Sequence, residues 1–131
     1  MKKLLISLLV SLLLFLTAII IYLVVLPCAI FHMILKLTFT KQYVKIIESF
    51  TYIFKSHAIG IDQIGNSAFH IFFNDVFIKD KTIHPFGKID ETISSVIGKN
   101  KIINNLRLEG KILDFIISIF DKNHSIKSID N

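Results

Sequence analysis

The chain opens with a long apolar run that occupies residues 4–26. No charged residue occurs in it, and a charge there would cost several kcal/mol in hydrocarbon. A helix of that length reaches roughly 34 Å at ~1.5 Å per residue, which is enough to cross a hydrocarbon core of ~30 Å. The run therefore predicts a membrane-spanning helix near the N-terminus.

A retained anchor is the preferred interpretation of this run. A signal peptide typically has a shorter apolar centre of ~7–15 residues and a cleavage site flanked by small residues, whereas this run ends in Leu26-Pro27-Cys28-Ala29. A cleaved signal peptide and a buried helix of a soluble core are the alternatives. Pro27 is expected to end or kink the helix, and we assign the anchor region to residues 1–37.

The pattern becomes amphipathic over residues 41–57, where apolar side chains recur at spacings of three and four. Thr40 is the expected start of this helix, and residues 38–57 form the predicted juxtamembrane segment. Its apolar face can pack on the following domain or lie on the bilayer surface. The lysines that follow the span are expected to meet lipid headgroups, and they are Lys36, Lys41, Lys45 and Lys55.

Residues 58–131 are expected to form a small helical domain with a polar tail. Asp90 is a suitable N-cap for one of its helices, and Gly98 suits the position just after that helix. The predicted helices cover residues 62–77, 91–97 and 111–120, and the tail 121–131 is expected to be frayed or draped over the surface. The predicted fold class is all-α, with a transmembrane helix followed by three or four short helices.

Charge and composition exclude several classes of function. The 131 residues contain 15 basic and 10 acidic side chains and a single cysteine. One cysteine excludes an internal disulfide and a multi-cysteine metal site. Lys2 and Lys3 supply part of the net charge of +5, and the rest is too dispersed for a nucleic-acid partner. Lysines flank the span almost equally, with a slight preference for a cytoplasmic C-terminal domain.

No sequence motif marks a cofactor site, a metal site or a nucleophile. We therefore expect no cofactor and no metal, and the missing catalytic signatures argue against an enzyme. Polar residues instead gather in three clusters along the chain. These clusters are Asp62, Gln63 and Asn66; Asp90, Glu91 and Ser94; and Asp121 and His124.

The three clusters allow two interpretations. If they met in space, His124 could move a proton while Asp62, Asp90 or Glu91 oriented its ring, and these four are the catalytic candidates. The same residues also suit helix caps, turns and a buried hydrogen-bond network, and this structural interpretation is preferred.

The order of the clusters resembles a family of small proteins encoded by bacteriophages and prophages. The matching segments are IDQ-x-x-N at residues 61–66, DETIS at 90–94 and D-x-x-H at 121–124, so the resemblance covers roughly residues 61–129. It implies a viral origin and a host-membrane setting, and it assigns no particular activity.

The leading hypothesis is a phage-like, single-pass protein of the host inner membrane that acts by binding. Modifying the host envelope, excluding competing phage and assisting lysis are the roles that suit it. Membrane lipid and a host membrane protein are the expected partners. The alternatives are a membrane-tethered hydrolase that uses the Asp/Glu/His cluster, and a holin-like pore former.

Overall fold

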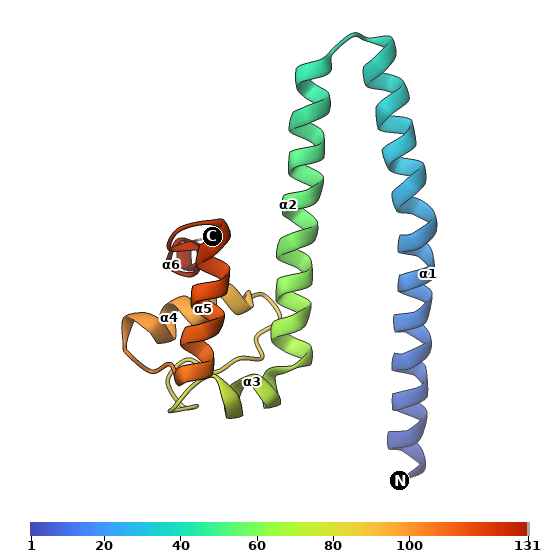
Figure 1. Ribbon diagram of the computed structural model, residues 1–131. Helices are drawn as coiled ribbons and strands as arrows, with labels where there is room; N and C mark the ends of the chain where they lie inside the picture. The colour runs from blue at the N-terminus through green and yellow to red at the C-terminus, as the bar shows by residue number, and fades with distance from the viewer. Residues whose placement is uncertain (131) are drawn as a thin grey trace. The chain divides into compact units, whose positions relative to one another are not determined.

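The computed structural model describes residues 1–130, and this part of the chain is all-α, as predicted (Figure 1). The only extended pairing described is an isolated antiparallel bridge between Ile78 and Leu106. The chain divides into two compact units, Met1–Tyr52 and Ile53–Asn131, with the boundary inside the second helix. The elements are α1 (Lys2–Phe39), α2 (Tyr43–Ala68), α3 (His70–Val76), α4 (Ile93–Ile102), α5 (Leu108–Phe120), α6 (His124–Lys127) and a 3₁₀ turn, η1 (Ser128–Asp130).

Helix α1 contains 38 residues, none of which is buried. Within the described residues, it is the one helix long and apolar enough to cross a membrane by length and composition. A helix from the core of a soluble protein would be mostly buried, and α1 is not. The structure thus has the N-terminal helix that the apolar run predicts.

Of the two outcomes expected at Pro27, an end of the helix is wrong, because α1 continues through Pro27 to Phe39. Proline removes one hydrogen bond from the helix, and the long apolar side chains on both sides favour continuation. Thr40 ends α1 and does not start the next helix. Its hydroxyl donates to the carbonyls of Lys36 and Leu37, each at 3.1 Å.

Helix α2 is longer than the predicted juxtamembrane helix and passes without a break through residues 57–62. Gly60 lowers helix propensity but does not interrupt the helix. A Cβ at Gly65 would lie 2.9 Å from Cδ1 of Ile93, so this glycine allows close packing. The helix predicted over residues 62–77 is instead divided at Phe69 into the end of α2 and the short α3.

Helix α4 begins two residues later than predicted, and its N-cap is Thr92 rather than Asp90. The Thr92 hydroxyl accepts a hydrogen bond from the backbone N–H of Ser95 at 3.0 Å, whereas the Asp90 side chain is exposed. Gly98 lies inside α4 and does not end it. A Cβ there would lie 2.1 Å from the carbonyl oxygen of Ser125, so Gly98 allows α6 to approach the α4 backbone.

The tail is also more ordered than predicted. Ser125 is fully buried, and its hydroxyl donates to the Asp114 carboxylate at 2.5 Å. Asp114 also pairs with Lys101 at 2.8 Å, which joins α4, α5 and α6. Helix α5 begins at Leu108, three residues before the predicted start at Lys111.

The hydrophobic core of the Ile53–Asn131 unit is small. Phe73, Phe77, Ile93 and Leu113 pack around it partly buried, and the rings of Phe73 and Phe77 stack with centroids 5.1 Å apart. The buried apolar side chains are Ile78, Phe86, Val96, Ile97 and Leu106. So small a core leaves much of the order in this unit to polar contacts.

Candidate binding groove

Asn66 attaches the loop before α4 to helix α2. It is fully buried, and its amide nitrogen donates to the carbonyls of Lys88 at 3.0 Å and Glu91 at 2.6 Å. Its amide oxygen accepts from the N–H of Gly87 at 2.9 Å. One side chain thus satisfies three loop backbone groups that have no helix or sheet partner. The loop at residues 87–91 is therefore fixed on one wall of the site.

Three further asparagines hold the earlier part of the same loop, and the sequence interpretation missed them. Asn74 exchanges two hydrogen bonds with the backbone of Phe86, at 2.8 and 3.1 Å. Asn100 donates to the His84 carbonyl at 2.8 Å, and Asn105 donates to the Asp80 carbonyl, also at 2.8 Å. A sequence signal existed for two of them, because Asn74 follows Phe73 and Asn105 precedes Leu106, whereas Asn100 stands between two lysines.

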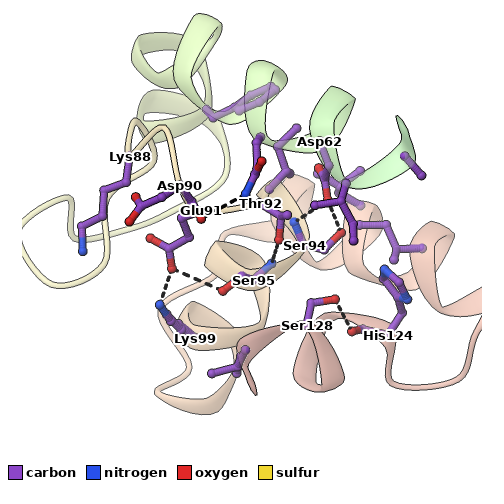
Figure 2. Close-up of a pocket in the computed structure, with 18 of the residues that line it drawn as sticks. Asp62, Lys88, Asp90, Glu91, Thr92, Ser94, Ser95, Lys99, His124 and Ser128 are labelled. Carbon is purple, nitrogen blue, oxygen red and sulfur yellow. Dashed lines mark hydrogen bonds and ion pairs between the residues drawn. The ribbon is translucent and has the colours of Figure 1, made fainter. Parts of the chain in front are cut away.

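Asp62 reaches from α2 to the start of α4. Its Oδ2 accepts from the Ser94 hydroxyl at 2.8 Å and from the Ser94 N–H at 3.3 Å. A carboxylate at a helix N-terminus satisfies a free N–H and interacts favourably with the helix dipole. Asp62 is thus a second cap for α4, supplied by another helix (Figure 2).

Glu91 also has partners within the fold. It forms an ion pair with Lys99, and its Oε1 accepts from the Ser95 hydroxyl at 3.3 Å. The Glu91 side chain is 11% exposed, so an unpaired charge there would be costly. Two of the four catalytic candidates, Asp62 and Glu91, therefore stabilise α4 and its loop.

The polar clusters meet around an open groove of about 730 Å³ in the Ile53–Asn131 unit (Figure 2). Asn66 and Asp121 do not line the groove. Its apolar lining includes Ile59, Phe73, Phe77, Leu113 and Ile117. The predicted site residues that line it are Asp62, Gln63, Asp90, Glu91, Ser94 and His124.

His124 lines the groove from the C-terminal side, and its Nδ1 lies 3.1 Å from Oδ2 of Asp121. Lys127 contacts the other oxygen of the same carboxylate at 2.5 Å. Hydrogen bonds from Lys127 and His124 lower the pKa of Asp121 below its usual value. Among the described residues this pair resembles a base with an orienting carboxylate, and of the two only His124 lines the groove.

Lys55 and Lys88 line the groove and form no ion pair within the described residues. The other predicted membrane-surface lysines, Lys36, Lys41 and Lys45, belong to the Met1–Tyr52 unit. Within residues 1–130, no group of three His, Cys, Asp or Glu side chains could hold a metal ion. Comparisons with protein-family models, curated proteins and solved structures found no match to the chain.

Proposed function

We propose that this chain is a phage-like, single-span protein of the host inner membrane, and that it acts by binding through the groove. In this proposal α1 is the anchor and the Ile53–Asn131 unit lies in the cytoplasm. The observation that carries the proposal is that two of the groove's carboxylates stabilise the fold, while an apolar surface remains available for a partner. Asp62 and Glu91 are engaged by the fold itself, and the remaining lining is largely apolar.

This arrangement favours binding over proton transfer at the two engaged carboxylates. A general acid or base must change its protonation state during a reaction. Protonation of Asp62 would weaken a helix cap, and protonation of Glu91 would leave Lys99 without its partner. The polar lining residues alternate with an apolar wall that makes up most of the exposed lining surface, and such a combination is typical of a site that binds a ligand or a peptide segment. We propose an apolar segment of a host membrane protein as the partner, with envelope modification, phage exclusion or lysis assistance as the outcome.

A membrane-tethered hydrolase is the second candidate, favoured by the contact between Asp121 and His124. A carboxylate on Nδ1 of a histidine fixes the ring tautomer and leaves Nε2 to move a proton. In this case His124 would be the base, and Asp62, which lines the same groove from α2, would be a second catalytic candidate.

Two kinds of substitution separate these candidates in the full chain expressed in host cells. Asp62→Asn and His124→Asn remove titratable groups but keep hydrogen-bonding atoms near Ser94 and Asp121. Ile59→Lys places a charge on the apolar groove wall, and Ile64→Lys makes the same change on α2 outside the groove. The readout is the effect on host lysis and on plaque formation by a challenging phage.

The binding proposal predicts that Ile59→Lys abolishes the effect, whereas Ile64→Lys and the two asparagine variants retain it. Membrane content and circular dichroism of each purified variant show that it is present and folded. Loss of the effect in Asp62→Asn and His124→Asn, with the fold intact, would instead favour the hydrolase. An unaffected Ile59→Lys variant would remove the groove from the proposal.

A further inference from the structure

We infer that the outward face of α5 docks on a lipid bilayer that carries anionic headgroups. This inference rests on the proposed function, because it requires α1 to hold the chain at a membrane. It concerns a surface other than the groove and names its partner as lipid.

The outward face of α5 is a continuous apolar stripe without a covering element among the described residues of the Ile53–Asn131 unit. Its positions recur at spacings of three and four, which places them on one side of a helix. The exposed fractions are 69% for Leu108, 51% for Ile112, 67% for Phe115, 48% for Ile116 and 63% for Ile119. Soluble monomeric proteins rarely leave such a patch in water, so a partner is expected.

The opposite side of α5 is already occupied. Leu113 packs against the core and, with Ile117, lines the groove. A Cβ at Gly110 would lie 2.4 Å from the Phe77 carbonyl oxygen, which shows how closely this side approaches the domain. Helix α5 therefore packs on the domain through its Leu113 and Gly110 side, and the apolar stripe faces outward in addition to that packed side.

Charge favours a lipid surface as the occupant of this stripe. No charged residue lies within the stripe. Lys111 is exposed along one of its borders, Glu109 is exposed along the other, and Lys122 is exposed two residues after α5 ends. Neither lysine forms an ion pair in the described chain. Asp114 lies on the inner side, where Lys101 and Ser125 bind it. An apolar face with unpaired basic side chains close to it suits a helix that lies in the plane of an anionic membrane.

Area argues against a second copy of the chain as the occupant. A helix of 13 residues is about 20 Å long. One face ~10 Å wide would therefore cover ~200 Å², far below the ~800 Å² per partner of a standard protein interface. A bilayer needs no matching surface, and the anchor supplies a high local concentration.

The test places a fluorophore on the full chain in vesicles of phosphatidylcholine with or without phosphatidylglycerol. In a Cys28→Ser background, Phe115→Cys labels the stripe and Ile83→Cys labels an exposed loop position as the control. Lipids that carry a quencher in the acyl chain report contact with the membrane. We expect several-fold stronger quenching at 115 than at 83, and a decrease at 115 when phosphatidylglycerol is omitted.

Equal, weak quenching at 115 and 83 would overturn the inference, and so would a cross-link at 115 between two copies of the chain. Resistance to alkaline carbonate extraction is measured on the same vesicles. If carbonate leaves the chain in the vesicles but the fluorophore at 115 is not quenched by the lipid, only the docking of α5 is disproved. A chain that carbonate releases disproves the anchor and, with it, the proposed function.

Discussion

Helix α1 and the Ile53–Asn131 unit are both rich in apolar residues, yet they use them in opposite ways. In α1 every residue is exposed or intermediate, and no residue is buried. The second unit buries five apolar side chains, but it also buries six polar ones, including Asn66, Asn100 and Ser125. Hydrophobicity alone therefore does not make a core. The folded unit depends on amide and hydroxyl groups that join backbone segments, whereas α1 leaves its apolar side chains exposed and is long and apolar enough to cross a membrane.

The largest effect should come from placing charges in α1. Leu13→Asp together with Leu16→Asp adds about 3 kcal/mol per residue to the cost of membrane insertion. We expect the double variant to lose its resistance to alkaline carbonate. The same two changes at the exposed positions Ile83 and Ile103 of the second unit should leave the chain in the membrane. Full retention of the α1 variant would show that α1 is not the anchor.

In the folded unit, the contact between Gly98 and the Ser125 carbonyl should be the most sensitive to an added methyl group. Gly98→Ala should destabilise the domain by roughly 3 kcal/mol, since a backbone atom blocks the Cβ and α6 must move. Gly60→Ala is the matched control, because nothing lies within 4 Å of its Cβ position. The control should gain up to about 1 kcal/mol from better helix propensity. Thermal unfolding in detergent measures the stability of the two variants. Equal changes in stability would contradict the close contact between Gly98 and the Ser125 carbonyl.

The hydrogen bonds between buried amide side chains and the loop backbone are tested by Asn66→Ala. The change removes the Asn66 bonds to the Gly87 N–H and the Glu91 carbonyl, and it leaves the Lys88 carbonyl with only the Glu91 N–H at 3.3 Å. The expected cost is about 3 kcal/mol in unfolding free energy. Gln63→Ala removes a single bond of 3.2 Å to the Asp90 carbonyl and should cost less than about 1 kcal/mol. If the two variants were equally stable, the loop would not depend on the buried amide.

The N-cap of α4 offers a smaller test. Thr92→Ala should lower the unfolding free energy by about 1 kcal/mol, because it removes the acceptor for the Ser95 N–H. Asp90→Ala should have almost no effect, since the Asp90 side chain is exposed. Urea unfolding followed by circular dichroism compares the two variants. A larger loss of unfolding free energy in Asp90→Ala than in Thr92→Ala would show that Asp90 is the cap.

The smallest effect concerns acid pH. The pKa of Asp121 is lowered by hydrogen bonds from Lys127 and His124, so the folded state favours the ionised form. This contribution is present above the unfolded pKa of about 3.9 and is lost as pH falls through the lower folded pKa. The melting temperature should fall as the pH drops through about two units around that unfolded value, from about pH 5 to about pH 3. Asp121→Asn should reduce this fall, because the variant has no carboxylate to protonate. Asp90→Asn is the control, and an identical fall in both variants would contradict the role of Asp121.

Periodicity and charge were enough to predict the all-α class, α1 and most of α5, because long apolar patterns of this kind have few alternatives. The start of α4 could not be predicted, since Asp90 and Thr92 are both good caps locally. The bond from Asn66 to the Glu91 carbonyl holds the loop and shifts the start to Thr92. Convergence of the polar clusters also depends on distant contacts, such as that of Asp62 with Ser94, which no local pattern contains.

The close approach of α6 to Gly98 has a consequence for synthesis on the ribosome. The residues that cover this side of α4 are made after every other helix of the domain, whereas α1 is made first. During translation the N-terminal segment can thus be delivered to a bilayer while the rest of the polypeptide is still incomplete. Until the residues around Ser125 emerge, the face of α4 at Gly98 would lack the backbone that packs against it in the finished domain.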